Sequence, residues 1–200
     1  LATSSAIGSG ILWPSITNSG TVRTVTRGFF AYHGGASAAT ISALGTSYPD
    51  YMYIQNQAIT DPVNANRGTY RVSFLFDGTT LEILGKGTGG HIRVRVDGQL
   101  VSASPTTFTS GGTPYWLPVT FASRAMRLIT IDASVAFSFG GVATGPNDTI
   151  VAAPVPGPRC IVLGDSFTDG TGATGGGSTA WVRRFGEAMG WPDTWASGLG

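Results

Sequence analysis

The chain has 200 residues, 42% of them hydrophobic and only 12% charged, and its formal net charge at pH 7 is +1. A chain of this length and hydrophobicity can bury the core of one large domain or of two small ones. The near-zero net charge gives no electrostatic reason to expect nucleic acid or a membrane surface as a partner. No apolar run approaches the roughly 20 residues that cross a bilayer.

Cys160 is the only cysteine, which excludes an internal disulfide, and its apolar neighbours predict a buried, inert thiol. No cluster of His, Cys and carboxylate residues has the spacing of metal ligands, so we expect no metal. The chain starts at Leu1 with neither a basic nor a long apolar leader. The compartment is therefore unknown from the sequence, with secreted, periplasmic or virion-associated settings favoured.

Residues 1–28 are rich in Ser, Thr, Gly and Ala, and we expect an N-terminal extension or an edge segment there. From residue 29 onward the pattern changes to short strands. In residues 70–76 every second side chain is apolar, which predicts a strand packed against a core. The residues on that apolar face are Tyr70, Val72, Phe74 and Phe76.

Two Asp-Gly pairs, Asp77-Gly78 and Asp97-Gly98, predict hairpin turns. The first would lead into a return strand over residues 81–84. The second would follow a strand over residues 91–96, in which Arg93 and Arg95 point outward. Further strands are predicted over residues 115–121, 126–131 and 135–139. Short strands with regular turns favour an antiparallel β-sandwich, jelly-roll-like, over residues 29–153.

Residues 154–158 contain three prolines and predict a stiff linker. After it, residues 160–163 are apolar on both faces, as in a parallel strand buried between helices. A helix capped by Ser178 or Thr179 follows, and Gly190 and Pro192 end it. Its apolar positions are Trp181, Val182, Phe185, Ala188 and Met189. With a second strand over residues 193–197, residues 159–200 form the incomplete opening of an α/β domain.

Ser166 stands at the carboxyl end of the first strand of this domain, where open α/β sheets collect their ligands. A serine hydroxyl becomes a nucleophile when a base takes its proton and a rigid turn exposes it. Gly164 permits the tight turn, and the backbone N–H of Ser166 can point at a developing oxyanion. Asp165 is expected to stabilise the turn as an acceptor rather than to act as a base.

The stretch IVLGDSFTDGTGA, residues 161–173, resembles the first conserved block of the SGNH hydrolases, also called GDSL esterases/lipases. Ser166 matches the nucleophile of that family, whose N–H also serves in the oxyanion hole. The rest of the block is matched by Gly164, Asp165, Thr168 and Gly170. The stretch WASGLG at residues 195–200 resembles the start of the second block, which implies that the oxyanion glycine is Gly200 or a residue just beyond it.

The resemblance covers about the last forty positions, and a domain of this kind usually needs many more. The family's Asn block and its D-x-x-H block are not in these residues. His33 and His91 precede Ser166, whereas the family's base follows its nucleophile. We expect a polar loop position for His33 and a solvent-facing strand position for His91. The 200-residue chain alone is therefore expected to be inactive, with the remainder of the SGNH domain supplied by later sequence or by another chain.

A β-sandwich in front of an SGNH domain is also the layout of the family 2 carbohydrate esterases, which remove acetyl groups from plant polysaccharides. The resemblance implies a carboxylic ester hydrolase that works through an acyl-serine, a carbohydrate O-deacetylase whose substrate is an acylated carbohydrate or another small ester. It implies no cofactor. Related deacetylases occur on bacteriophage tail proteins.

The sequence permits two other interpretations. Residues 170–175 spell G-x-G-x-x-G, but five residues separate them from the strand and two glycines delay the helix, which argues against a dinucleotide site. The alternative function is a non-catalytic carbohydrate-binding or structural sandwich whose aromatic side chains stack on sugars. Burial in the core is the competing interpretation of those aromatic residues. They are Tyr32, Tyr51, Tyr53, Tyr115 and Trp116.

Overall fold

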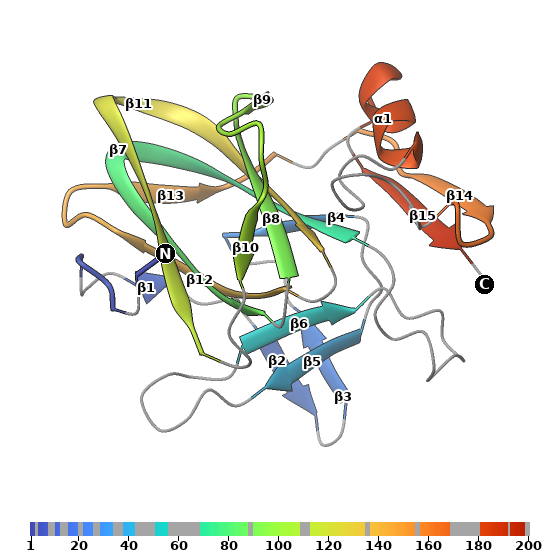
Figure 1. Ribbon diagram of the computed structural model, residues 1–200, viewed down its shortest axis with the longest axis horizontal. Helices are drawn as coiled ribbons and strands as arrows, with labels where there is room; N and C mark the ends of the chain where they lie inside the picture. The colour runs from blue at the N-terminus through green and yellow to red at the C-terminus, as the bar shows by residue number, and fades with distance from the viewer. Residues whose placement is uncertain are drawn as a thin grey trace.

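The computed structural model describes residues 1–2, 4–7, 11–12, 16–19, 22–25, 29–33, 38–42, 51–55, 69–87, 90–108, 113–134, 137–154, 157–168, 181–191 and 193–198. These residues form a mostly antiparallel β-sandwich followed by a small α/β unit that lies beside it (Figure 1). The predicted mostly-β fold is confirmed.

Thirteen described strands precede the α/β unit. In chain order they are β1 (Ile11–Leu12), β2 (Ile16–Ser19), β3 (Val22–Val25), β4 (Ala31–His33), β5 (Ala38–Ser42), β6 (Tyr51–Gln55), β7 (Thr69–Gly87), β8 (Gly90–Val96), β9 (Gln99–Leu100), β10 (Thr106–Phe108), β11 (Tyr115–Ser134), β12 (Phe137–Thr144) and β13 (Thr149–Ala152). Strands β2 and β3 pair with each other as a separate two-stranded sheet, and the other eleven form the continuous sheet of the sandwich. The α/β unit contains β14 (Cys160–Gly164), α1 (Trp181–Ala188) and β15 (Thr194–Gly198).

Two long strands, β7 and β11, pair antiparallel over almost their whole length and run through both layers of the sandwich. The first half of β7 is flanked by β4 and β13, and its second half by β12. The second half of β11 continues the first layer to β8. The register shifts between Thr120 and Ala125, at the point where the pair changes layers.

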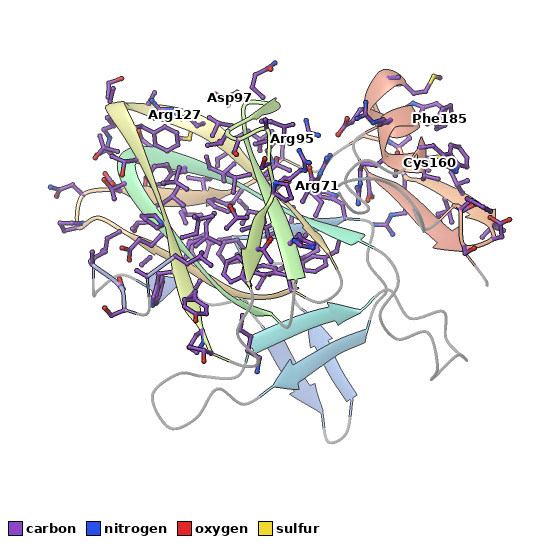
Figure 2. All side chains as sticks on the ribbon, viewed as in Figure 1. Arg71, Arg95, Asp97, Arg127, Cys160 and Phe185 are labelled. Carbon is purple, nitrogen blue, oxygen red and sulfur yellow. The ribbon has the colours of Figure 1, made fainter. Side chains whose placement is uncertain are left out.

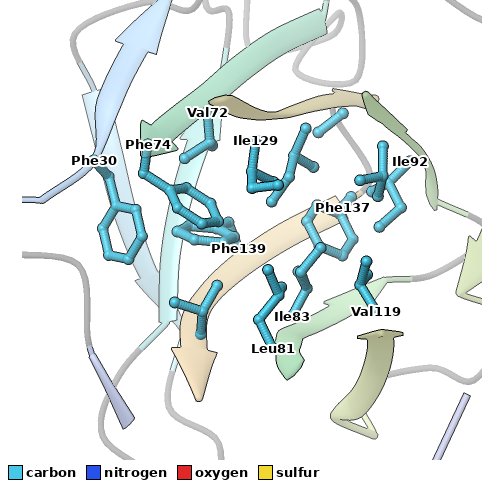
Figure 3. Packing of buried hydrophobic residues seen from close by; sticks show 14 of the residues in the cluster. Phe30, Val72, Phe74, Leu81, Ile83, Ile92, Val119, Ile129, Phe137 and Phe139 are labelled. Atoms are coloured by element: carbon cyan, nitrogen blue, oxygen red, sulfur yellow. The ribbon is translucent and has the colours of Figure 1, made fainter. Parts of the chain in front are cut away.

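The core lies between the two layers and is built from the alternating apolar face of these strands. Val72, Phe74 and Phe76 are fully buried, as the period of two predicts. The ring centroid of Phe30 lies 5.4 Å from that of Phe74 and 5.0 Å from that of Phe139, and both pairs have edge-to-face geometry (Figure 3). Aromatic contacts across strands therefore join the two layers.

The two predicted Asp-Gly turns have different outcomes. Asp97-Gly98 is a hairpin turn, with positive φ at both residues, 49° and 84°. Asp77-Gly78 is not a turn, because β7 continues through it. Gly78 lies against Asp148, whose carboxylate accepts hydrogen bonds of 3.2 Å from the backbone N–H groups of Thr79 and Thr80. The glycine is therefore needed for a close approach inside a strand.

The α/β unit has the order that the sequence predicts. Strand β14 pairs in parallel with β15, from Cys160 opposite Thr194 to Gly164 opposite Gly198. Helix α1 connects them on one side, and Gly190 ends it with a φ of 69°. Gly186 of α1 lies directly on Thr194 of β15. A parallel pair joined through a helix is the start of a parallel sheet.

The burial of this unit differs from the prediction. Cys160 is half-buried rather than buried, and Ile161 and Leu163 are 59% and 77% exposed. The buried face of α1 is formed by Val182, Arg183 and Gly186. Trp181 and Phe185 of α1, and Met189 directly after it, are exposed. Among the described residues, no element covers these apolar faces of the strand and the helix.

No described helix is long and apolar enough to cross a membrane.

We predict that Gly78→Ala lowers the free energy of unfolding by about 1–3 kcal/mol, the usual cost of overpacking. A Cβ atom at this position would lie 2.5 Å from Cζ of Phe76 and 2.6 Å from Cβ of Asp148. Chemical denaturation measures the change. Gly157→Ala is the matched control, since nothing lies within 4 Å of its Cβ position. Equal stabilities of the two variants would contradict the close approach.

Candidate active site

Ser166 follows β14 directly and lies in a short turn over residues 165–168. The N–H of Thr168 donates to the carbonyl of Asp165 at 3.0 Å, and the N–H of Phe167 donates to the Asp165 carboxylate at 3.0 Å. This second bond suits a side chain that stabilises the turn. The side chain of Thr168 is buried under Gly164, whose absent Cβ leaves room for it.

The turn leaves Ser166 half-buried, with exposed residues on both sides of it. Phe167 is 70% exposed. The turn lies at the carboxyl end of β14, beside the end of β15, because Gly164 and Gly198 pair in register. A hydroxyl group at this edge is accessible to a ligand. Gly170 and Gly200, two of the predicted site residues, lie outside the described residues.

Neither histidine is brought to Ser166. His91 is exposed on β8, and its Nδ1 lies 2.9 Å from the Thr107 hydroxyl. The expectation of a loop position for His33 is wrong, because His33 is a buried residue of β4. Its Nδ1 lies 3.4 Å from Asp193, which precedes β15. Asp193 lies at the amino ends of β14 and β15, whereas Ser166 follows the carboxyl end of β14. The two ends of a five-residue strand are about 16 Å apart, so His33 does not reach Ser166.

A row of polar residues crosses the outer face of the first layer, and sequence reasoning had assigned no role to it. In register, Arg93 of β8 is opposite Asp132 of β11, Asp132 is opposite Arg71 of β7, and Arg71 is opposite His33 of β4. The alternation of inward and outward side chains along a strand could have identified Arg71 and Asp132 as outward-facing residues. Which residues lie beside them depends on the strand order, which cannot be read from the local sequence.

The α/β unit covers this row and is tied to it by ion pairs. Asp132 accepts from Nε of Arg71 at 2.7 Å and from Nε of Arg95 at 2.9 Å. Glu187 of α1 lies 3.0 Å from Nη2 of Arg71 and 3.4 Å from Nη2 of Arg95. Within the α/β unit, Asp193, which also contacts His33, accepts from Nε of Arg159 at 2.8 Å. We call this contact region between the sandwich and the α/β unit the junction. Figure 2 shows Arg71 and Arg95 on the side of the sandwich that faces α1.

Burial and charge shift the pKa values at the junction. Burial raises the pKa of Asp132, but the charges of Arg71 and Arg183 outweigh burial, so the pKa is lowered. Burial lowers the pKa of Arg183 to about 10, and the charge of Arg71 adds to this effect. Burial also lowers the pKa of His33, more than the nearby Asp193 raises it, which favours the neutral imidazole.

Five aromatic residues are candidates for stacking on sugars. Those whose side chains the structure describes pack into the sandwich instead. Trp116 is 1% exposed, and Tyr32 and Tyr115 pack against the core. The side chains of Tyr51 and Tyr53 lie outside the described residues. In the described part of the chain, no three His, Cys, Asp or Glu residues form a group that could hold a metal ion.

We predict that Gly164→Ala disrupts the turn that carries Ser166, because its Cβ would lie 3.0 Å from Cβ of Thr168 and closer still to the hydroxyl oxygen. The expected loss in free energy of unfolding is about 1–3 kcal/mol. Since the nearest atom is the threonine hydroxyl, the double variant Gly164→Ala/Thr168→Ala should recover part of this loss in chemical denaturation. An unchanged stability of the single variant would refute the contact.

His33 should make stability depend on pH. Its folded pKa is below the unfolded value of about 6.5, so the unfolded state binds more protons between the two. The free energy of unfolding should therefore fall as the pH is lowered from about 7 to about 5, and His33→Gln should remove this decline. Denaturation at several pH values measures it. His91→Gln is the control and should keep the decline; a decline that survives in His33→Gln would contradict the assignment.

Comparisons with known proteins place this fold. Neither a family model nor a curated protein matches the sequence. Among solved structures, a salicylyl-acyltransferase from a tetracycline biosynthetic pathway matches with a TM-score of 0.64 and 18% identity, over 86% of this chain and 53% of that one. An acetyl xylan esterase from the rumen bacterium Butyrivibrio proteoclasticus matches with a TM-score of 0.59 and 13% identity, over 88% and 48%.

A family two carbohydrate esterase from Clostridium thermocellum, solved in complex with cellohexaose, matches with a TM-score of 0.54 and 17% identity, over 68% of this chain and 48% of that one. This chain thus spans about half the length of each of these proteins. At such low identity the likeness concerns the fold alone. The described chain has the mostly-β fold found in carbohydrate esterases and in an acyltransferase.

Proposed function

We propose that this chain carries the leading β-sandwich and the nucleophile segment of a serine ester hydrolase of the SGNH type, which removes acetyl groups from carbohydrate. Ser166 attacks the ester carbonyl and forms an acyl-serine, which water then hydrolyses. Its backbone N–H and a glycine at or after Gly200 hold the oxyanion. A His accepts the serine proton and an Asp orients that His; both lie outside these residues.

The observation that carries the proposal is the position of Ser166. It lies in a hydrogen-bonded turn at the carboxyl end of β14, beside the end of the parallel strand β15. The fold comparisons support it. A match over 86% of 200 positions is longer than residues 1–158, so the likeness to the acyltransferase reaches into the α/β unit. The esterase neighbours supply the reaction class, and the one solved with cellohexaose supports a carbohydrate substrate.

The exposed apolar faces of the α/β unit support a larger domain. Ile161 and Leu163 on β14 and Trp181 and Phe185 on α1 are each at least 39% exposed. Large apolar side chains gathered in this way mark an interaction surface. The remainder of the SGNH domain, from later sequence or from another chain, would cover them and supply the missing catalytic groups.

The alternative, a non-catalytic sugar-binding or structural sandwich, has weaker support. Tyr32, Tyr115 and Trp116 pack into the core rather than forming a stacking surface. A sandwich without catalysis also gives no reason for a serine in a constrained turn at the end of a parallel strand. Sugar binding by the sandwich would still be compatible with the esterase.

The test uses the full protein that contains this chain. A fluorophosphonate should label it, and peptide mapping should place the adduct on Ser166, because only an activated serine reacts quickly. Ser166→Ala should lose labelling and at least about a thousandfold in kcat for acetylated oligosaccharides, the usual effect of removing a nucleophile.

Ser102→Ala, at an exposed serine of the sandwich, is the matched control and should keep full labelling and turnover. An adduct on any other residue, or undiminished turnover by Ser166→Ala, would end the proposal. If the intact protein is not labelled at all, the result favours the non-catalytic alternative.

A further inference from the structure

The junction contains a half-open cavity of about 370 Å³. Its walls come from the outer face of the first layer, from Ala153 and Pro154 where the predicted linker begins, from Gly98 in the β8–β9 turn and from Glu187 of α1. Small-molecule sites usually have volumes of about 300–1,000 Å³. The junction cavity is therefore large enough to hold a small ligand.

This cavity is separate from the proposed catalytic serine. Ser166 does not line it, and its position in the fold explains why. His33 and Asp193 meet at the amino ends of β14 and β15, whereas Ser166 follows the carboxyl end. The cavity and the serine thus lie at opposite ends of the same parallel strands, and a ligand here would play no part in attack on the ester.

The lining of the cavity is partly charged and partly apolar. Arg71, Arg95 and Glu187 supply charged groups, and Ser73 and Thr130 supply hydroxyl groups. Leu128, Ala153 and Pro154 supply apolar surface. A ligand that contacts both kinds of group needs a polar head and an apolar body.

Charge decides which polar head fits. Five guanidinium groups of the junction accompany three carboxylates, and burial lowers the pKa of His33, which favours its neutral form. The guanidinium groups belong to Arg71, Arg93, Arg95, Arg159 and Arg183, and the carboxylates to Asp132, Glu187 and Asp193. The bond from Arg183 to the carbonyl of Thr194 is 3.5 Å long, and Nε of Arg93 is buried without a hydrogen-bond partner. The surplus is positive, so an anion is favoured over a cation.

The pair of arginines suits a carboxylate in particular. Nε of Arg71 and of Arg95 is occupied by Asp132, which leaves the two Nη2 groups to share a single oxygen of Glu187. The Glu187 side chain is 36% exposed, whereas the Asp132 side chain beneath is 2% exposed. An incoming carboxylate would share or take the place of Glu187, while Asp132 keeps both guanidinium groups oriented.

We propose that the junction cavity is a binding site for a small organic carboxylate. The carboxylate binds to Arg71 and Arg95, and the carbon skeleton lies on Leu128, Ala153 and Pro154. Bound there, the ligand contacts both the sandwich and α1, and so stabilises their association.

Isothermal titration of the purified protein at low salt compares hexanoate with its neutral isostere hexanamide, and with inorganic phosphate as an anion without an apolar body. We expect hexanoate to bind at least about tenfold more tightly than either, because only it offers both a carboxylate to the guanidinium groups and an apolar body to Leu128, Ala153 and Pro154. Equal binding of hexanoate and hexanamide, preference for phosphate, or no binding of hexanoate at millimolar concentration would overturn the proposal.

Variants place the binding in the cavity. Arg95→Met should weaken hexanoate binding at least about tenfold, and Leu128→Trp, which places a larger side chain in the cavity, should abolish it. Glu187→Gln should strengthen binding, since it removes the competing carboxylate; a purely structural cavity gives no such gain. Arg124→Met, at an exposed arginine paired with Asp77 outside the cavity, is the matched control. Binding that these cavity variants leave unchanged would refute the site, independently of any result at Ser166.

Discussion

The arrangement of the molecule depends on one buried ion-pair network, in which Asp132 holds Arg71 and Arg95 on the outer face of the sandwich. A buried carboxylate is costly to desolvate unless it is paired, and here two guanidinium groups pair with it. The same two arginines reach Glu187 of α1. The network thus fixes the first helix of the α/β unit against the sandwich, and the outer face of the sheet becomes an internal contact.

This contact sets the direction of the α/β unit. The amino ends of β14 and β15 face the sandwich through Asp193, so the carboxyl ends, with the turn that carries Ser166, point away from it. In the proposed esterase, this orientation would leave the edge that holds Ser166 available for substrate and for further β–α units. The solved structures with a similar fold include carbohydrate esterases and an acyltransferase.

Much of the fold follows from local patterns in the sequence. The period of two placed Val72, Phe74 and Phe76 in the core, and Gly190 marked the end of α1. The turn predicted at Asp77-Gly78 is wrong. This dipeptide is typical of turns, but here Gly78 allows the strand to approach Asp148 closely, seventy residues later in the chain. The partners of Arg71 and the strand position of His33 were also beyond local reasoning, since they depend on which strands are neighbours. Ser166 could be singled out because its signal, an apolar strand that runs into Gly-Asp-Ser, is local.

The central claim, that the α/β unit is docked on the sandwich through buried ion pairs, is tested most directly by a double-mutant cycle between Arg71→Met and Glu187→Gln. Chemical denaturation of the wild type, both single variants and the double variant gives the coupling energy. The account predicts one cooperative transition and a favourable coupling of about 0.5–3 kcal/mol, as for residues in direct contact. A coupling indistinguishable from zero, or separate unfolding of the two parts, would contradict it.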